Sequence, residues 1–370
     1  MSSVLLIEPY YGGSHAAWVD GIRNHSTHEV IYITHPDAYW RWRLRGGAVT
    51  LAEETKKVID KVGEFDLVLV SGMIDLSTWL GLTRKYLNDV PVVLYLHENQ
   101  LNYPTKAGEE RSDEFSLINW KSLLAADEIW FNSEFQRQAM FEALPSLLRK
   151  APDFSHEYLI PKVKERTRVV PVGVDLKKFK RIKNNRSNPL VLWNQRWDYD
   201  KNPKEIASSI LELSREGIEF DVALVGENVR KNPKELLEVK NELGAKVVQF
   251  GFLPRDEYVE LLNQTDIVVS AAIHEFFGIA IVEAVAAGAF PILPNHQNYP
   301  ELIPEKWHKS VLYPPGQLVE RLREVLLNLN TWRPLVEGLD EEMRKYEWAI
   351  IIKYYDSLIE TVISEYGHKL

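Results

Sequence analysis

Short apolar runs alternate with amphipathic stretches along the whole chain of 370 residues. Apolar runs of about four to eight residues bounded by polar turns are typical of buried strands in a parallel sheet. The stretches between them have the period of helices that cover such a sheet. The pattern therefore predicts an α/β protein with doubly wound sheets.

The alternation is interrupted once and then restarts, which predicts two domains. Strands are expected at 4–8, 30–34, 67–71, 92–96, 128–132 and 169–172, with helices at 14–25, 51–62, 75–87, 113–126 and 133–144. Further strands are expected at 190–194, 221–225, 247–250, 267–270, 290–293 and 311–313. The interruption is a lysine-rich segment, 176–189, whose composition is typical of an exposed connector. We predict domains over 1–180 and 187–345, and a C-terminal helix over 346–370 that packs back on the first.

The composition narrows the function classes. The absence of cysteine excludes disulfide scaffolds, cysteine-ligated metals and thiol nucleophiles. No run approaches the roughly 18 uncharged apolar residues of a membrane span, and 4–7 is too short for a signal sequence. We therefore expect a soluble cytoplasmic protein without stable membrane association. No oligomeric state is predicted.

The net charge of −9 argues at first against a nucleic-acid partner, because phosphates require clustered positive charge. The charge is segregated, however. Residues 149–186 contain twelve basic and four acidic residues, a local charge of +8. A second basic cluster, 39–45, interleaves Arg41, Arg43 and Arg45 with aromatic residues that include Trp42. It is either a solvated amphipathic turn or a surface that stacks on bases or sugars and contacts phosphates.

Ligands of doubly wound sheets bind in the loops that follow the strands. The loop 8–15 contains Gly12 and Gly13 before a predicted helix, which allows backbone amides to approach an anion, although a tight turn explains it equally. Neither a Walker A loop nor GxGxxG is present, which argues against a dehydrogenase. The loop 97–104, His-Glu-Asn-Gln-Leu-Asn-Tyr-Pro, is dense in hydrogen-bonding side chains, which favours a functional interpretation.

Two loops of the second half carry candidate phosphate chemistry. Arg196 and Lys201 lie five residues apart on one strand-to-helix loop and form a plausible cationic clamp for a diphosphate. Asp198 and Asp200 between them match an Asp-x-Asp metal motif, but such a triplet is common by chance and we predict no metal there.

The second of these loops follows the strand predicted at 267–270. Glu275 lies in it, Gly278 allows close backbone approach, and a helix from Ile279 directs free amides at an anion. Glu283, about one turn into that helix, is placed to accept hydrogen bonds from a ribose diol.

These residues carry a family resemblance. Pro-Val-Gly-Val-Asp at 171–175, Arg196 with Lys201, Gly251-Phe252 and Glu275-x7-Glu283 resemble the retaining GT-B glycosyltransferases of family 4. The motifs at 7–15, 40–46 and 97–104 are similar to a narrower group, the tRNA-queuosine α-mannosyltransferases. The resemblance implies two Rossmann-like domains facing each other across a cleft, GDP-mannose as donor, and queuosine at the anticodon wobble position of tRNA for aspartate as acceptor. It also implies a cytoplasmic enzyme that requires no metal or other cofactor.

The resemblance also implies roles for individual residues. His97 is expected near the reacting centre and Glu275 on the sugar hydroxyls. Expected at the donor are Gly12, Gly13, Arg196, Lys201, Phe252, Phe276, Phe277, Gly278, Ile279 and Glu283. Expected at the acceptor are Ser14, His15, Arg41, Trp42, Arg43, Arg45, Asn99 and Gln100.

Two alternatives stay open. A family 4 glycosyltransferase with a lipid or polysaccharide acceptor would place the basic, aromatic face against a membrane. A non-catalytic protein of the same fold would bind a nucleotide sugar or RNA without transfer.

Overall fold

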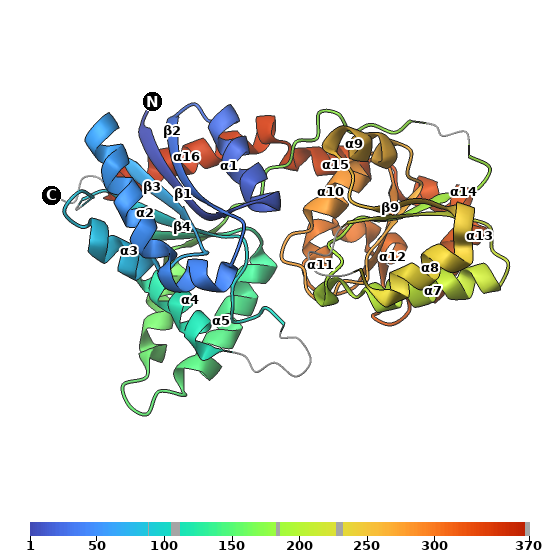
Figure 1. Cartoon of the computed structure of the whole chain (residues 1–370), viewed down its shortest axis with the longest axis horizontal. Coiled ribbons are helices and arrows are strands. Elements are labelled where there is room, and N and C mark those ends of the chain that lie inside the picture. Colours follow the sequence, from blue (N-terminus) through green and yellow to red (C-terminus); the bar gives the residue numbers. More distant parts are fainter. Residues whose placement is uncertain (88, 105–111, 183–185, 227–231, 367–370) are drawn as a thin grey trace. The chain divides into compact units, whose positions relative to one another are not determined.

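The computed structural model describes residues 1–87, 89–104, 112–182, 186–226 and 232–366, and the chain divides into two compact units. The first unit comprises Met1–Val174 and the segment from Trp348 onward, and the second comprises Asp175–Glu347. Each unit contains one six-stranded sheet in which all paired strands run parallel (Figure 1). The predicted α/β fold with two doubly wound sheets is confirmed.

The first sheet has the strand order β2-β1-β3-β4-β5-β6. Its strands are β1 (Ser3–Tyr11), β2 (Glu29–Pro36), β3 (Leu67–Ser71), β4 (Val92–Leu96), β5 (Glu128–Phe131) and β6 (Thr167–Val169). The helices of this unit are α1 (Gly13–His25), α2 (Trp40–Val62), α3 (Leu76–Thr83), α4 (Asp113–Ala125), α5 (Glu134–Leu148), α6 (Ile160–Glu165) and α16 (Trp348–Tyr366).

The second sheet has the order β12-β11-β10-β7-β8-β9. Its strands are β7 (Leu190–Trp193), β8 (Asp221–Val225), β9 (Val247–Gly251), β10 (Ile267–Val269), β11 (Phe290–Pro294) and β12 (Leu312–Tyr313). Its longer helices are α7 (Pro203–Arg215), α8 (Lys234–Leu243), α9 (Arg255–Asn263), α10 (Ile279–Ala286) and α13 (Leu318–Leu327). The shorter ones are α11 (Tyr299–Leu302), α12 (His308–Val311), α14 (Leu329–Trp332) and α15 (Leu339–Met343).

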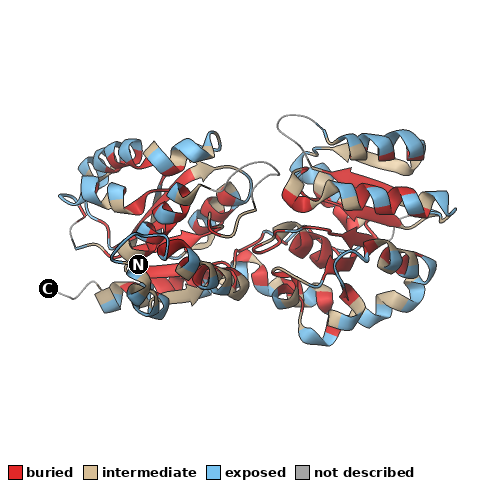
Figure 2. Ribbon diagram, turned by 90° about the horizontal axis from the view of Figure 1, so that it is seen from below, coloured by how far each residue is buried: buried red, intermediate tan, exposed pale blue. Residues whose placement is uncertain are grey.

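Burial explains why these segments form strands. Every residue of β3, β4, β5 and β7 is buried, as expected for parallel strands with helices on both faces. Figure 2 shows the buried strands inside each unit and exposed helix faces outside. Removal of this apolar surface from water stabilises each unit by roughly 25 cal/mol per Å².

Strand order locates the binding edge of each sheet. In the first sheet the order reverses between β1 and β3, and in the second between β7 and β10. Ligands of doubly wound sheets bind beyond the carboxyl ends of the strands at such a reversal. The loops after β1, β7 and β10 are therefore the places where function is to be sought, and they contain the glycines, the cation pair and Glu275 of the sequence prediction.

The C-terminal helix α16 packs on the first unit. The hydroxyl of Tyr355 accepts a hydrogen bond from Trp18 in α1 at 3.2 Å and donates one to the Pro171 carbonyl at 2.9 Å. The buried carboxylate of Asp356 accepts a hydrogen bond from the Ser26 hydroxyl at 2.7 Å. The last described helix of the chain therefore belongs to the same core as the first.

The segment predicted as an exposed connector is exposed at most of its described residues but is anchored at two points. Leu176 and Phe179 are fully buried in the second unit, and their carbonyls accept hydrogen bonds from Arg344. Arg181 pairs with Asp266 at 2.6 Å. The lysines of 176–182 are exposed, as predicted, while Leu176 and Phe179 anchor the segment to the second unit. Residues 183–185 lie outside the described residues.

Two element boundaries also differ from the prediction. The cluster 39–45 is not a turn or loop but the start of α2, and Gly46 and Gly47 lie inside this helix. Strand β6 pairs over Thr167–Val169 rather than 169–172. It ends early because Pro171 has no N–H to donate to the ladder.

Candidate functional site

Lys201 is the centre of a charged group after β7. Its side chain is buried, and its ammonium donates hydrogen bonds to the carbonyl of His274 at 2.7 Å and to Glu275 Oε2 at 3.1 Å. Asp200 Oδ2 lies 3.2 Å from the same nitrogen. Arg196 reaches the other side of Asp200, with Nη2 at 3.6 Å from Oδ2. The structure thus brings the predicted cation pair together through a carboxylate.

Asp200 has no exposed surface. Its carboxylate balances two cations, and its backbone carbonyl accepts hydrogen bonds from the amides of Ile273 and His274. Among the described residues, Asp198 and Asp200 belong to no group of side chains close enough to share a metal ion. Asp200 joins the loop after β7 to the loop after β10.

The loop after β10 presents its backbone rather than its aromatic side chains. Phe276 and Phe277 are buried, packed edge-on against His274 and Tyr346 respectively. Burial of both side chains leaves the predicted donor contact to the backbone of this loop, and that contact stays a prediction. Gly278 has φ 97°, a conformation that glycine adopts without strain, and caps α10.

The amides at the start of α10 carry the positive end of the helix dipole. Ile279 is the first residue of this helix, as predicted. Glu275 comes directly before Phe276 and Phe277 in the same loop. The site therefore presents backbone donors at the end of the strand and a carboxylate beside the buried ammonium.

Glu283 is held in place by two partners that the sequence did not reveal. Its Oε1 accepts a hydrogen bond from Arg255 at 2.6 Å, and its Oε2 accepts one from the Tyr258 hydroxyl at 2.9 Å. Burial raises the pKa of Glu283, opposed by Arg255 and by the Tyr258 hydroxyl. Arg255 and Tyr258 lie in the first turn of α9, the helix that follows β9. Ligands of such sheets bind beyond the carboxyl ends of the strands, so their position after β9 is a signal that could have identified them from the sequence.

Phe252 lies just beyond β9 and is two-thirds exposed. An exposed aromatic ring at the carboxyl end of a strand offers a flat face for a nucleobase. Its position agrees with the donor role expected from the sequence.

The first unit places a polar cluster at the carboxyl ends of β1 and β4. His15 Nδ1 lies 3.0 Å from Glu8 Oε2, and the His15 and His97 rings lie with their centroids 4.1 Å apart. Burial, followed by the nearby His15, holds the pKa of His97 well below its usual range, so this imidazole is neutral at pH 7. Its Nε2 is buried and finds no hydrogen-bond partner among the described residues.

Glu8 is the residue of this cluster that the sequence did not single out. Its side chain is fully buried, and it also accepts a hydrogen bond from the Tyr10 amide at 2.8 Å. The ligand atoms of Glu8, His15 and His97 all lie within 4.8 Å of one another, a spacing and donor set that a transition metal can take. A hydrogen-bonded carboxylate and imidazole pair satisfies the same atoms without an ion.

The glycines after β1 form the start of α1. Gly12 is the cap, and a Cβ there would lie 2.1 Å from the Asp37 carboxylate, so only glycine is accommodated. Gly13 and Ser14 are exposed in the first turn. These three residues are accessible to a ligand at the carboxyl edge of the first sheet.

The two amides predicted at the acceptor have different environments. Asn99 is fully buried, and its side-chain oxygen accepts a hydrogen bond from the Asn102 amide at 2.9 Å. It stabilises the turn after β4, and its contact with the acceptor stays a prediction. Gln100 is partly exposed, and its side chain donates to Glu98 at 3.0 Å.

The basic cluster at the start of α2 keeps part of its predicted surface character. Trp42 and Tyr39 are 62% and 81% exposed, which leaves both rings available for stacking. Arg41 lies over the Trp40 ring, and Arg43 contacts the Pro36 carbonyl at 3.4 Å. Arg45 makes a two-pronged pair with Glu114, at 2.8 and 2.6 Å, which neutralises it.

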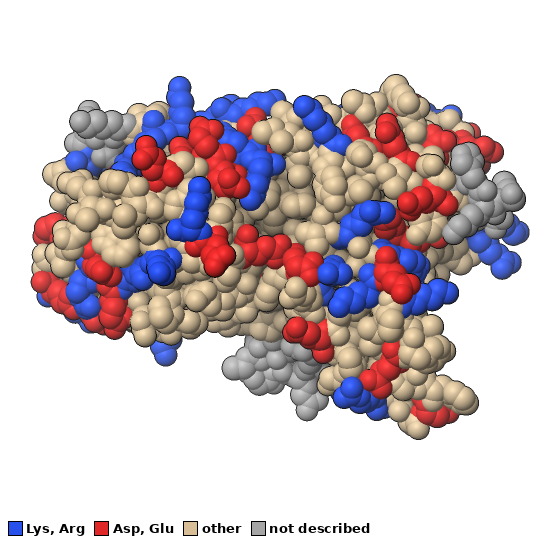
Figure 3. All heavy atoms as spheres, turned by 180° about the vertical axis from the view of Figure 1, so that it is seen from behind, with Lys and Arg blue, Asp and Glu red and all other residues tan. Residues whose placement is uncertain are grey.

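The longer basic stretch does not form the positive stripe that its sequence suggested. Several of its cations face carboxylates: Arg149 with Glu157, Lys150 with Asp113, Arg168 with Glu128, Lys178 with Asp256, Arg181 with Asp266, and Arg186 with Asp221. On the face that Figure 3 shows, basic and acidic side chains lie beside each other. Six of the twelve basic residues in this stretch are therefore paired with carboxylates in space.

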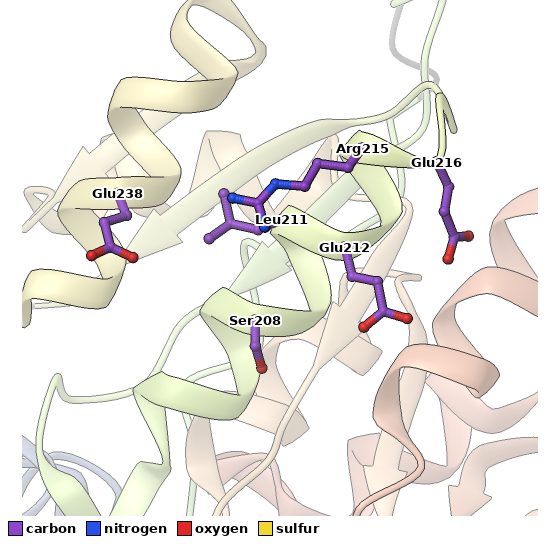
Figure 4. A pocket seen from close by; sticks show the side chains of 6 residues that line it. All are labelled: Ser208, Leu211, Glu212, Arg215, Glu216 and Glu238. Atoms are coloured by element: carbon purple, nitrogen blue, oxygen red, sulfur yellow. The ribbon is translucent and has the colours of Figure 1, made fainter.

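A surface hollow on the second unit is not a donor site. It lies between α7 and α8 and is lined by Ser208, Leu211, Glu212, Arg215, Glu216 and Glu238 (Figure 4). Arg215 is paired with Glu242 outside the lining set, at 2.7 Å. Three glutamates would repel a diphosphate, and α7 and α8 do not belong to the loops at the strand-order reversal.

Comparison with known proteins agrees with this geometry. Residues 175–345 match the family model described as glycosyl transferases group 1, and with the site at β7 and β10 they define a glycosyltransferase. Residues 3–174 match the model described as tRNA-queuosine alpha-mannosyltransferase N-terminal. A tRNA-queuosine alpha-mannosyltransferase of Drosophila melanogaster is 33% identical over 82% of each chain. The chain belongs to this family, which confirms the resemblance drawn from its motifs.

More distant relatives share the fold. A GDP-mannose:cellobiosyl-diphosphopolyprenol alpha-mannosyltransferase of Xanthomonas oryzae is 24% identical over 67% of this chain and 60% of its own. Sucrose-phosphate synthase from Thermosynechococcus elongatus superposes with a TM-score of 0.77 at 16% identity, covering 99% of this chain and 100% of its own. Anabaena HepE in complex with UDP and glucose gives 0.68 at 16%, covering 98% and 100%. Within the described residues, no helix combines the length and apolar character needed to cross a bilayer.

Proposed function

We propose that this enzyme transfers mannose from GDP-mannose to the queuosine at the anticodon wobble position of tRNA for aspartate, with retention of configuration, in the cytoplasm. The observation that carries the proposal is the site at the order reversal of the second sheet in a chain of this family. Lys201, Arg196, Glu275 and the start of α10 converge there, which is the chemistry that a sugar nucleotide requires.

The donor half of the proposal follows from the loops after β7, β9 and β10. Arg196 and Lys201 supply positive charge for the diphosphate, and the amides from Phe277 to Ile279 supply backbone donors. Glu283, fixed by Arg255 and Tyr258, accepts hydrogen bonds from the ribose diol. Phe252 offers its exposed ring to the base.

The chemistry lies mainly in stabilising the leaving group. Glycosyl transfer passes through an oxocarbenium-like state while negative charge develops on the departing diphosphate. Preorganised cations and amides stabilise that charge, and a single such donor is worth about 10²- to 10³-fold in rate. Glu275 holds the sugar hydroxyls, and we assign no protein nucleophile.

The acceptor half rests on the first unit. The neutral His97 lies at the carboxyl end of β4, and its buried Nε2 stands 3.9 Å from Glu8 Oε2. The family resemblance places this histidine near the reacting hydroxyl group. Ser14, His15 and Gln100 lie on loops at the same edge. Arg41, Trp42 and Arg43 at the start of α2 provide a stacking and phosphate-contact surface for the RNA.

One incubation tests both substrates. The enzyme is mixed with radiolabelled GDP-mannose, or with other labelled sugar nucleotides, and with tRNA that contains or lacks queuosine. We expect label in RNA only for GDP-mannose with queuosine-containing tRNA. Label in RNA from another sugar nucleotide changes the donor, and label in tRNA without queuosine contradicts the acceptor. Label in an added lipid or glycan instead replaces the acceptor class.

We also propose that transfer requires no metal, because lysine, arginine and helix amides already supply the positive charge. Excess EDTA is expected to leave the transfer rate unchanged, and elemental analysis of the purified enzyme to find no stoichiometric transition metal. Loss of activity restored by one divalent cation would contradict this, and would direct attention to Glu8, His15 and His97.

A further inference from the structure

The ammonium of Lys201 is closely surrounded by oxygen atoms in this structure. A lysine has three N–H donors and no acceptor. Three oxygens surround Nζ: the His274 carbonyl at 2.7 Å, Glu275 Oε2 at 3.1 Å and Asp200 Oδ2 at 3.2 Å. Two of them accept hydrogen bonds and the third is an ion-pair contact. The side chain is buried, so a diphosphate oxygen that reaches Nζ competes with these oxygens for it.

The three oxygens are not equally able to leave. The His274 carbonyl belongs to the backbone, whose amide is bonded to the Asp200 carbonyl. The Asp200 side chain has no exposed surface and also faces Arg196. The Glu275 side chain is 17% exposed, and its other side-chain contact, from Gln195, is long at 3.5 Å.

Charge points to the same oxygen. Arg196 and Lys201 carry two positive charges, and Asp200 and Glu275 carry two negative charges, so the group is neutral. An incoming diphosphate adds negative charge beside both carboxylates and repels them. Only the carboxylate that is free to move, Glu275, can relieve this repulsion by leaving. Movement of Glu275 removes a negative charge from the neighbourhood of Lys201 and restores the balance.

We propose that Glu275 is an exchangeable partner of Lys201. A phosphate oxygen of the donor takes its place on Nζ, and the released carboxylate accepts hydrogen bonds from the donor sugar. Asp200 stays in place as the permanent counter-charge and is a positioning residue for both cations. This inference rests on the proposed function, and it makes diphosphate binding and sugar recognition interdependent.

The exchange separates the nucleotide product from the sugar nucleotide. GDP must displace Glu275 from Lys201 and offers no sugar hydroxyls in return. GDP-mannose displaces the same carboxylate but gives it new hydrogen bonds. The wild-type enzyme is therefore expected to prefer GDP-mannose over GDP, a preference that favours product release after transfer.

Calorimetric titration of Glu275→Ala and Glu275→Gln with GDP and with GDP-mannose tests this inference. Both variants are expected to bind GDP about three- to tenfold more tightly than the wild type, as expected when a competing charged hydrogen bond is removed. Both are expected to lose the preference for GDP-mannose. Glu242→Gln is the matched control, because it removes one negative charge from the same unit at a surface pair with Arg215.

GDP affinity that is unchanged or lower in both Glu275 variants overturns the exchange. The isosteric glutamine variant keeps the test valid if the alanine variant does not fold. A wild-type enzyme that binds neither GDP nor GDP-mannose would instead contradict the proposed donor, so the two failures are distinguishable.

Discussion

At the residue scale, the buried side chains of the donor site act through their neighbours. Lys201 is a cation whose charge is balanced on two sides, and Glu283 is a carboxylate fixed by two donors. A buried charge that loses its partner is costly, so substitution here affects both stability and catalysis. The measurements must therefore separate the two effects.

Replacement of Lys201 by methionine keeps most of the side-chain volume but removes the charge at the departing diphosphate. We expect turnover to fall by about 10²- to 10³-fold, the range for loss of one preorganised donor. Asp200 and Glu275 would then face each other without a cation, so the melting temperature should fall as well. Turnover measured well below that temperature, beside Arg215→Met as a surface control, isolates the catalytic effect. Near-normal turnover would remove Lys201 from the mechanism.

The sequence identified candidate residues in the loops that directly follow strands. It did not identify residues that contact the site from another helix. Arg196, Lys201 and Glu275 were found because two loops concentrate their chemistry. Arg255 and Tyr258 were missed because they contact Glu283 from another helix, 28 and 25 residues away. The sequence could not show that Asn99 stabilises a turn, because a side chain with that role has the same sequence signature as one that binds a ligand.

At the element scale, the strands were more predictable than the helix ends. The bounds of β3, β4 and β8 agree with the sequence prediction because a strand buried on both faces is an uninterrupted apolar run. The start of α2 could not be predicted, because Tyr39 adopts a left-handed conformation and two glycines follow within the helix. Helix starts with a side-chain cap are easier to recognise, and α3 has one.

Asp75 caps α3, and its loss should destabilise the first unit. Its side chain accepts a hydrogen bond from the Thr78 amide at 3.1 Å and from the Ser77 hydroxyl at 2.6 Å. Asp75→Ala should lower the free energy of unfolding by about 1 kcal/mol at pH 7. Urea denaturation followed by circular dichroism measures this difference.

The destabilisation should depend on pH. Burial opposes ionisation of Asp75, but the hydrogen bonds from Ser77 and Thr78, with Lys121 nearby, hold its pKa below the usual value. A depressed folded-state pKa gives stability that is present above the unfolded value, near 3.9, and lost as the pH falls through the folded value. The difference between wild type and Asp75→Ala should therefore be constant from pH 7 to 5 and shrink below about pH 4. Asp75→Asn keeps a cap without the charge, so the difference between the wild type and this variant should also shrink below about pH 4. A difference that stays constant with pH would contradict the electrostatic part.

At the scale of the whole molecule, charge along the sequence proved a poor guide to charge in space. The stretch 149–186 carries a local charge of +8, yet many of its cations contact carboxylates from distant parts of the chain, such as Asp266 and Asp113. Pairing of this kind depends on tertiary contacts, which a local count cannot include. The shorter cluster at the start of α2 is therefore the better candidate for an RNA surface.

The RNA surface is tested by removing Arg41 and Arg43 together, leaving Arg45 because Glu114 already neutralises it. Each phosphate contact contributes roughly 0.7 to 0.9 to the slope of log affinity against log salt. We expect Arg41→Ala/Arg43→Ala to weaken tRNA binding by about an order of magnitude at low salt and to reduce that slope by about one to two. Arg215→Ala/Arg323→Ala removes the same charge from glutamate-paired positions in the second unit and should leave binding unchanged.

Equal loss of tRNA affinity in both variants would mean that only net charge matters. Unchanged binding in both would show that the RNA surface does not lie at the start of α2. Loss of liposome co-sedimentation rather than tRNA binding in the first variant would favour the lipid acceptor that the sequence left open.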